Sequence, residues 1–249
     1  MKPTIVFRPF GENGPKVALY GCDSGDWNVN GLSKSGDHVC RPGLFFRLNR
    51  ITETFCLSKI LMPSPINCNA KICNPEDLTV GIQKEIGSVA LIRGVDADGV
   101  VLHPGLTGGI ATADCPTIIA YCRVSGTTIM AHGGMKSITN GVVDSVIKKA
   151  EELRLGEIKV FITCGIAVHS YERVDLAPSL PRECTIGNFI DLRKLISEKF
   201  NRYGVYDVTT DTIDTFGDRR GTEFLWHSYR RGKTPADKAG RNLVLVVNI

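Results

Sequence analysis

A cysteine and a histidine at the ends of two apolar segments are the residues best suited to chemistry in this sequence. Cys115 follows Asp114 in the segment ATADCPTII, and His132 ends the run TTIMAH. Both segments have the composition of buried strands, and neighbouring strands would bring the two side chains to one edge of a sheet. The sequence therefore predicts a site built on Cys115 and His132.

Two kinds of site are compatible with this pair. As zinc ligands, Cys115 would bind as a thiolate and His132 as a neutral imidazole, with a third protein ligand and one position left for water. As a catalytic dyad, His132 would accept the thiol proton and Cys115 would attack a carbonyl carbon. A buried cysteine near a hydrogen-bonded core histidine is the ordinary alternative, and the pair alone does not exclude it.

The residues after His132 predict a glycine turn and then an amphipathic helix. Gly133 and Gly134 can adopt backbone angles closed to other residues, so amides near the helix start could bind a phosphate, with Lys136 adding positive charge. Apolar residues then recur every three or four positions, at Ile138, Val142, Val146, Ala150 and Leu153. The pair Asn140-Gly141 weakens the helical pattern near its start.

The rest of the chain predicts strands and one more helix. EIKVFITCGI and NLVLVVNI are expected to be strands, the second buried on both faces, and residues 191–204 are expected to form a helix that Asp191 begins. Near the N-terminus, VALYGC and GLFFRLNRI are predicted as short strands. The order of elements predicts a single α/β (α+β) domain over residues 1–249, with a central mixed β-sheet and packed helices.

Composition limits the classes of partner. The chain has 249 residues, 43% of them hydrophobic, and a formal net charge of +4, which does not resemble a nucleic-acid-binding surface. No run is long enough to cross a bilayer, so we expect no membrane partner. The nine cysteines lack CxxC pairs and predict reduced thiols in a cytoplasm. Cys68 and Cys73 are expected to be packed or solvated thiols, since no second half of a metal knuckle follows them.

Four segments resemble the motifs of one known family, in the same order. ATADCPTII, AHGGMKSITNGVV, GIAVHSYERVD and FLWHSYRRGKTPADKAGRN are similar to its segments TADC, AHAGWRG-x-x-x-G, Gly-Pro-x-x-x-x-x-Tyr-Glu and SYRR-x-G-x-x-GR. They mark the YfiH family, once called multicopper polyphenol oxidoreductases. The resemblance covers residues 80–249, and residues 1–79 match only weakly, as strands and loops. It implies a YfiH-like fold, similar to that of a bacterial toxin deamidase that uses a Cys-His dyad.

The sequence departs from the family at two positions. The family's Gln-x-His-Gly motif supplies its first zinc ligand, but aligning Gly87 with the motif glycine places Ile86 at the histidine, and isoleucine cannot bind zinc. A third ligand must then come from elsewhere, and among three other histidines His169 is preferred over His103 and His227. Met135 and Lys136 replace the family's Trp-Arg; Lys136 keeps the charge and loses the bidentate fork.

The resemblance implies a purine nucleoside phosphorylase that also deaminates adenosine, with purine nucleoside and phosphate as its ligands. Zinc held by Cys115 and His132 would assist, Asp114 would orient a ligand, and Arg230 or Arg231 would face the pocket. A metal-free Cys-His amidase or deamidase is the alternative enzyme. A degenerate member that binds a nucleotide or a partner without turnover is the non-enzymatic alternative. A multicopper oxidase is disfavoured, because the chain has only five histidines.

Overall fold

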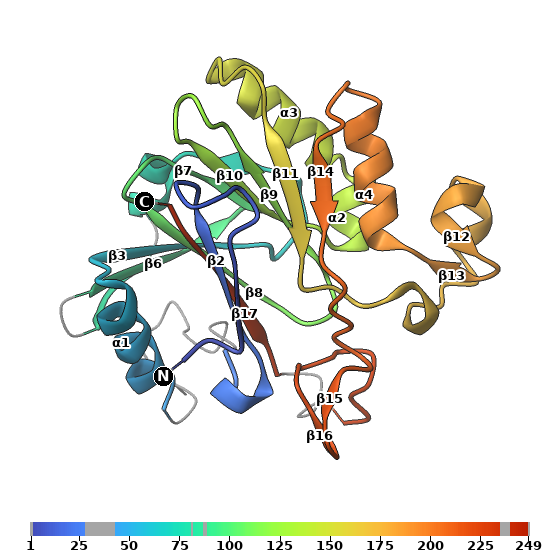
Figure 1. Cartoon of the computed structure of the whole chain (residues 1–249), viewed down its shortest axis with the longest axis horizontal. Coiled ribbons are helices and arrows are strands. Elements are labelled where there is room, and N and C mark those ends of the chain that lie inside the picture. The colour runs from blue at the N-terminus through green and yellow to red at the C-terminus, as the bar shows by residue number, and fades with distance from the viewer. Residues whose placement is uncertain (1, 28–42, 81, 87–88, 235–239, 249) are drawn as a thin grey trace.

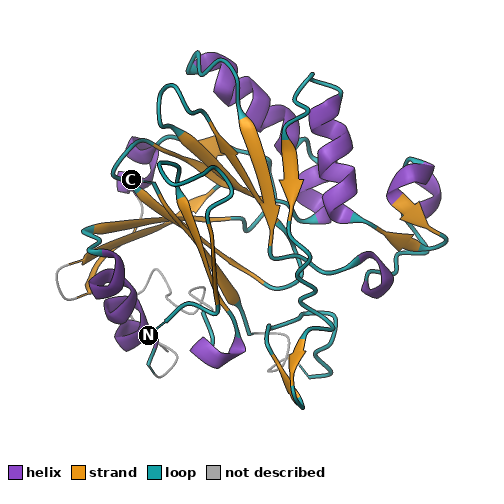
Figure 2. Cartoon of the chain, in the orientation of Figure 1, coloured by secondary structure: helices purple, strands orange, loops and turns teal. Residues whose placement is uncertain are grey.

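Two mixed β-sheets stacked face to face form the centre of the protein, and helices cover both outer faces (Figures 1 and 2). The computed structural model describes the chain except for residues 1, 28–42, 81, 87–88, 235–239 and 249. The predicted α+β class is confirmed, and the predicted mixed sheet is divided into two layers. No helix in the described ranges is long and apolar enough to span a membrane.

The first sheet has seven strands among the described residues, in the order β1-β2-β17-β8-β3-β6-β5. Their bounds in that order are Ile5–Phe7, Lys16–Tyr20, Asn242–Val247, Thr107–Thr112, Lys59–Ser64, Val89–Asp96 and Ile82–Ile86. Strand β17 is antiparallel to both neighbours and buried along its whole length, which its unbroken apolar run predicts. Strand β3 is parallel to both β8 and β6, so the sheet is mixed.

The second sheet has six described strands, in the order β14-β11-β9-β10-β7-β4. Their bounds in that order are Val208–Thr210, Lys159–Thr163, Thr117–Tyr121, Thr128–His132, Gly99–Leu102 and Ile72–Cys73. Strand β10 is antiparallel to β9 and to β7, and it places His132 opposite Thr117. Two small hairpins lie outside the sheets, formed by β12 (Thr185–Ile186) with β13 (Phe189–Ile190) and by β15 (Arg219–Arg220) with β16 (Glu223–Phe224).

Four helices complete the layers of the described chain. Helix α1 (Leu44–Phe55) packs on the outer face of the first sheet, while α2 (Met135–Thr139), α3 (Val142–Glu152) and α4 (Leu192–Asn201) cover the second (Figure 1). Between the sheets lies a core of fully buried side chains that includes Ile110, Ile119, Met130 and Val244. Burial of this apolar area is the main stabilising contribution to the stacking of the sheets.

The predicted strand GLFFRLNRI is wrong, because these residues form most of α1. Leu44, Leu48 and Ile51 follow one another at spacings of four and three, which places them on one face of a helix, and all three are buried. The apolar pair at positions 45 and 46 concealed this spacing. Phe46 is 65% exposed, so it contributes little to the core that a strand would have needed.

The helix predicted after the glycine turn is divided in two. Asn140 ends α2, and Gly141, with φ of +89°, begins α3. The left-handed conformation at Gly141 breaks the helix where the sequence pattern was weakest. The second predicted helix is confirmed as α4, whose first turn Asp191 caps by accepting a 3.0 Å hydrogen bond from the amide of Lys194.

Three segments carry the chain from the first sheet to the second. Residues 65–71 join β3 to β4, residues 97–98 join β6 to β7, and residues 113–116 join β8 to β9. Strand β10 ends beside two of these crossings, since Ala131 lies opposite Gly99 and His132 lies opposite Thr117. The crossings therefore bring loop residues from distant parts of the chain to His132.

Candidate active site

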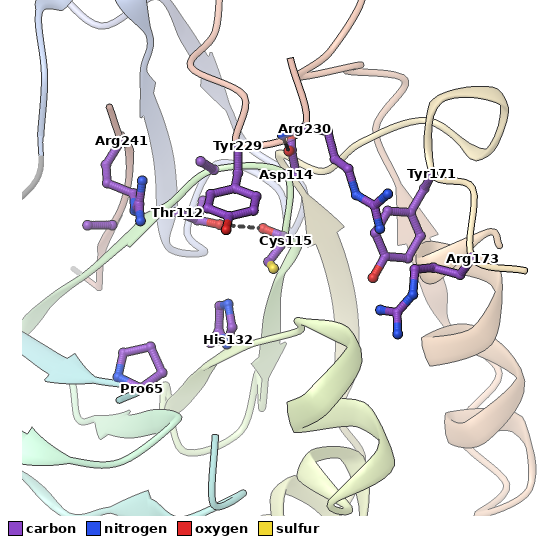
Figure 3. Close-up of a pocket in the computed structure, with 12 residues that line it drawn as sticks. Pro65, Thr112, Asp114, Cys115, His132, Tyr171, Arg173, Tyr229, Arg230 and Arg241 are labelled. Atoms are coloured by element: carbon purple, nitrogen blue, oxygen red, sulfur yellow. Dashed lines mark hydrogen bonds between the residues drawn. The ribbon is translucent and has the colours of Figure 1, made fainter. Parts of the chain in front are cut away.

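A pocket of about 380 Å³ opens where the chain crosses between the sheets (Figure 3). Its lining combines the Cys115 and His132 side chains with aromatic and cationic residues from the C-terminal half. The lining residues are Pro65, Ala111, Thr112, Ala113, Asp114, Cys115, His132, Tyr171, Arg173, Tyr229, Arg230 and Arg241. The structure thus brings together Asp114, Cys115, His132 and Arg230, all of which the sequence proposed as site residues.

The crossing at residues 113–116 fixes Cys115 at the pocket wall. Thr112 donates a 2.7 Å hydrogen bond to the Cys115 carbonyl oxygen (Figure 3). Asp114 has φ of +77°, a left-handed conformation that is uncommon for residues other than glycine. Its buried carboxylate accepts hydrogen bonds from the Thr215 hydroxyl at 2.7 Å and the Arg230 amide at 2.8 Å. These bonds hold the Cys115 segment in its strained path.

His132 lies between Cys115 and a buried carboxylate. Its Nδ1 is 3.0 Å from the Ser137 hydroxyl and 3.4 Å from Asp98 Oδ1. Ser137 in turn donates a 2.5 Å hydrogen bond to the same Asp98 oxygen. Figure 3 shows the Cys115 sulfur pointing toward the imidazole. Asp98 and Ser137 therefore fix the orientation of the ring, as the outer partners of ligating or catalytic histidines do.

The glycine pair after His132 is explained by close packing. A Cβ on Gly134 would lie 2.6 Å from His132 Cε1 and 2.9 Å from the Cys115 sulfur. A Cβ on Gly133 would lie 2.9 Å from the Pro116 carbonyl oxygen, to which the Gly133 amide donates. The Gly133 amide is therefore already paired. At position 134, glycine lets Cys115 and His132 approach each other.

A second thiol lies close to His132 on the side of Asp98. Ligand atoms of Cys68, Asp98 and His132 all lie within 4.8 Å of one another, and they form the one such cluster of three among the residues that the structure describes. Cys68 belongs to the crossing at residues 65–71, and the sequence predicted it only as a packed or solvated thiol. The described residues can therefore hold a metal ion through thiolate, carboxylate and imidazole groups.

The cluster changes the acidity of its members. Burial alone would lower the pKa of His132, but the charge of Cys115 and hydrogen bonds with Asp98, Cys115 and Cys68 raise it well above its ordinary value. The hydrogen bond with His132 lowers the pKa of the Cys68 thiol. For Asp98, burial raises the pKa, yet hydrogen bonds from His132, Ser137 and Ala70 lower it overall. The groups favour a thiolate and a carboxylate around a cationic imidazole.

Arg230 is the pocket's best-placed cation. Its guanidinium carbon lies 4.7 Å from the centre of the Tyr171 ring, and its Nη1 donates to the Glu172 carbonyl oxygen at 3.1 Å. Among the described residues no carboxylate lies within ion-pair distance of its guanidinium. Arg173, by contrast, forms a bidentate pair with Asp175 at 2.9 and 2.7 Å. The charge of Arg230 is therefore more available to an anion than that of Arg173.

Arg231, the alternative to Arg230, points away from the pocket. It donates to the carbonyl oxygens of Thr215 at 3.0 Å and Phe216 at 2.6 Å, and its guanidinium stacks 3.6 Å from the Phe224 ring. Burial lowers its pKa. Arg231 thus stabilises the turn beneath the site, while Arg230 faces the pocket.

Other proposed residues lie elsewhere. Lys136 is exposed on α2 and does not line the pocket. His169 and His103 are exposed, and Nε2 of His227 lies 3.2 Å from the Gly25 carbonyl oxygen. None of these three histidines lines the pocket. Ile86 is the last residue of β5. The side chain of Ile86 and the whole of Gly87 lie outside the described part of the chain. The structure brings Cys68, not His169, next to His132.

Sequence reasoning missed Cys68, Asp98 and Ser137. Ser137 lies within the motif segment AHGGMKSITNGVV, five positions after His132, whereas Asp98 stands in DADGVV, ahead of the first of the four motif segments. Cys68 had no such signal, because only the folding of an irregular loop brings it to the site. Tyr171, Arg173, Tyr229 and Arg241 lie within quoted motifs, although no pattern singled them out as lining residues.

The sequence profile described as "Multi-copper polyphenol oxidoreductase laccase" matches residues 74–248, so the chain belongs to this family, the YfiH family of the motif comparison. The fold is similar to Bacillus licheniformis hypothetical protein YfiH, with a TM-score of 0.71, 14% identity and coverage of 94% of this chain and 93% of that one. The fold is also similar to YlmD from Geobacillus stearothermophilus, with a TM-score of 0.70 and 21% sequence identity, over 97% of this chain and 94% of that one. Neisseria meningitidis protein NMB0706 is similar with a TM-score of 0.67 and 18% sequence identity, over 98% of this chain and 97% of that one. The chain matches no curated protein sequence.

The donor set distinguishes between the metals that the family name suggests. A multicopper centre needs several histidines, whereas His132 is the one histidine that lines the pocket or belongs to the described metal-binding cluster. These residues do not fit a multicopper site. The cluster of Cys68, Asp98 and His132 offers one sulfur, one oxygen and one nitrogen ligand, and zinc accepts all three kinds of ligand.

Proposed function

We propose that this protein is a purine nucleoside phosphorylase, which cleaves the bond between ribose and a purine with phosphate. The observation that carries the proposal is the combination of Tyr171, Tyr229 and Arg230 with Cys115 and His132 around one pocket. Aromatic rings suit the faces of a purine, and a guanidinium suits a phosphate. The family resemblance supports the same substrate class.

In the proposed reaction, a phosphate oxygen forms a bond to the ribose anomeric carbon as the bond from that carbon to the purine nitrogen breaks. The proton of hydrogen phosphate ends on the purine, so the products are ribose 1-phosphate and free base. Arg230 would bind the phosphate, and the hydrogen bond from its amide to Asp114 keeps it beside Cys115. Zinc bound by Cys115 and His132 would supply a Lewis acid, which the second activity, adenosine deamination, requires.

The pocket has a size that suits these substrates. A volume of about 380 Å³ lies within the range of small-molecule sites. Tyr229 is 51% exposed, so it lies at the entrance, where a bound base would cover part of its ring. Closing this face would bury apolar area of both partners and exclude water from the reacting atoms.

The test is release of free base from inosine or adenosine, in phosphate buffer and in a buffer without phosphate. We expect base release that depends on phosphate, and we expect Cys115→Ala to abolish it. Base release that is independent of phosphate would contradict phosphorolysis. No release from any purine nucleoside by zinc-loaded protein would overturn the proposal and leave the binding role.

A metal-free amidase or deamidase is the second candidate, and the position of His132 between Cys115 and Asp98 favours it. Cys115 would attack an amide carbon, His132 would give the thiol proton to the departing nitrogen, and water would then hydrolyse the thioester. Iodoacetamide distinguishes the candidates. Inactivation of metal-free, active protein by alkylation of Cys115 supports the dyad, whereas activity that needs zinc supports the phosphorylase.

A further inference from the structure

The pocket wall contains a second guanidinium that the proposed reaction leaves unused, that of Arg173. It lies on the same part of the wall as Arg230, and Figure 3 shows both guanidinium groups beside the Tyr171 side chain. We propose that Arg173, Arg230 and the Tyr171 hydroxyl form one cradle for a phosphate group, which makes Arg173 a second phosphate-binding residue. This inference rests on the proposed function and names the groups that would hold its phosphate.

The backbone of residues 171–173 directs these side chains into the pocket. Glu172 lies opposite Phe189 in an antiparallel bridge, and the Arg173 amide donates to the Asn188 carbonyl oxygen at 2.8 Å. Side chains alternate between two faces in such an extended segment, so Tyr171 and Arg173 share one face and Glu172 takes the other. Tyr171 and Arg173 accordingly line the pocket, while Glu172 is exposed.

Asp175 holds the Arg173 guanidinium in a fixed direction. It accepts from Nε at 2.9 Å and from Nη2 at 2.7 Å, which engages one edge of the planar group. A guanidinium has five N–H donors, and the pair leaves those of Nη1 for another acceptor. Asp175 is 64% exposed, so water screens its charge and the pair cancels only part of the field of Arg173. The pair therefore orients Arg173 and leaves it able to bind an anion.

The charge of the pocket wall is positive. The twelve lining residues include three arginines and one acid, Asp114, whose carboxylate already accepts hydrogen bonds from Thr215 and Arg230. The hydrogen bond from Arg173 lowers the pKa of the Asp175 carboxyl, and the charge of Arg230 acts in the same direction, so the two arginines influence one group. Such a wall attracts an anion.

A phosphate group fits this arrangement. Planar guanidinium groups bind phosphate oxygens through paired N–H donors, and a tyrosine hydroxyl can donate a further hydrogen bond. In phosphorolysis, Arg173 and Arg230 would hold the oxygens that do not react, so that the remaining oxygen faces the anomeric carbon. The same cradle would accept a phosphate group carried by the nucleoside, because the chemistry that is recognised is identical.

Isothermal titration calorimetry of the full chain with inorganic phosphate tests the cradle. We compare the wild type with Arg173→Gln and with Arg182→Gln, since Arg182 is exposed and does not line the pocket. We expect the dissociation constant for phosphate to rise about 10-fold or more in Arg173→Gln, because charged donors are lost, and to stay unchanged in Arg182→Gln. Equal affinity in all three proteins, or no phosphate binding by the wild type, would overturn the proposal.

Arg173→Lys provides a second variant. Lysine keeps the charge and loses the planar fork, so we expect a phosphate affinity between those of the wild type and Arg173→Gln. Thermal unfolding checks that each variant is folded. If Arg173→Gln is not folded, Arg173→Lys carries the test, and wild-type affinity in this variant would then reject the cradle.

Adenosine and adenosine 5′-monophosphate distinguish the two sources of the phosphate group. Both are titrated into the wild type and into Arg173→Gln, in buffer without phosphate. Equal affinities for the two ligands, together with binding of free phosphate that depends on Arg173, assign the cradle to inorganic phosphate. Tighter binding of the monophosphate that disappears in Arg173→Gln assigns the cradle to a phosphorylated substrate. A preference for the monophosphate that Arg173→Gln leaves unchanged would contradict the cradle.

Asp175→Ala tests whether Asp175 positions the guanidinium. We expect the affinity for phosphate to fall about 3-fold, because Arg173 must then be ordered on binding, and the affinity for adenosine to stay the same. A rise in phosphate affinity would show that Asp175 competes with the phosphate and would reject the positioning role.

Turnover separates failure of this inference from failure of the proposed function. Phosphate binding that depends on Arg173, in a protein that cleaves no purine nucleoside, would reject the phosphorylase alone. Phosphate-dependent base release with an unchanged KM for phosphate in Arg173→Gln would reject the cradle alone.

Discussion

The carboxylate of Asp114 accepts a 2.8 Å hydrogen bond from the backbone amide of Arg230, a residue 116 positions later in the sequence. The same carboxylate accepts from the Thr215 hydroxyl at 2.7 Å. Asp114 precedes Cys115, so one buried side chain fixes the position of Cys115 relative to Arg230. The distance between Cys115 and Arg230 therefore depends on Asp114.

Asp114→Asn tests that dependence. Asparagine tolerates the positive φ at this position, but its amide cannot accept from both Thr215 and Arg230. We expect a loss of about 1–3 kcal/mol in the free energy of unfolding, because a buried donor is left unpaired. Urea denaturation measures the loss. Thr215→Ser keeps the hydroxyl and serves as the control, and an equal loss in both variants would contradict the role of the carboxylate.

Gly134→Ala tests the close approach of Cys115 and His132. Gly134 has φ of −69°, an ordinary angle, so any effect of the added methyl group comes from its contacts at 2.6 and 2.9 Å with the two side chains. We expect kcat/KM for nucleoside cleavage to fall about 100-fold or more. Gly11→Ala, at a position with positive φ and no neighbour within 4 Å, should lower stability with little effect on activity.

Arg230→Lys tests phosphate binding. Lysine keeps the charge but loses the planar fork and the stacking on Tyr171. We expect KM for phosphate to rise about 10-fold, equivalent to roughly 1.4 kcal/mol, with a smaller change in KM for the nucleoside. Lys136→Ala is the matched comparison, since Lys136 is exposed outside the pocket. A larger effect from Lys136→Ala than from Arg230→Lys would place the phosphate at the helix instead.

The buried thiol of Cys73 predicts a loss of stability at alkaline pH. Burial raises its pKa to about 11, while it donates to the Gly99 carbonyl oxygen at 3.1 Å. A thiol whose folded pKa exceeds its unfolded value of about 8.5 stabilises the fold fully below that value. This stability is lost as pH rises toward 11.

Urea denaturation between about pH 8.5 and 11 measures the effect. In this window each such thiol contributes a slope of at most about 1.4 kcal/mol per pH unit. Cys73→Ala should remove one such contribution and flatten the decline, although it lowers stability at neutral pH by opening a small cavity. Cys56→Ala, at an exposed cysteine, should leave the slope unchanged. An unaltered slope in Cys73→Ala would exclude Cys73 as the titrating group.

Much of the fold could be predicted from the sequence, because in most elements the spacing of apolar residues matches the positions that are buried in the structure. Strand β17 and helix α4 were predictable, since one is uniformly apolar and the other has a capped amphipathic pattern. Helix α1 was not, because adjacent phenylalanines obscured its spacing of three and four. The division into two sheets depends on which strands pair, and pairing between distant segments leaves no local pattern.

The site was predictable where residues stand in motifs. Asp114, Cys115, His132 and Arg230 lie in such segments, and the structure brings them to one pocket. The closeness of Cys68 to His132 was not predictable, since Cys68 reaches this histidine only through a loop that joins the two sheets. The three histidines considered as a third zinc ligand do not line the pocket, and no spacing rule distinguishes their segments from the loop that carries Cys68.

Strand β17 has a consequence for the order of folding during synthesis. It is the last strand in sequence, yet it lies between β2 and β8 and joins β1-β2 to the rest of the first sheet. Until residues 242–247 have left the ribosome, strands β2 and β8 each have an unpaired edge. The nascent chain therefore exposes two apolar edges for most of its translation, a period in which chaperone binding would limit aggregation.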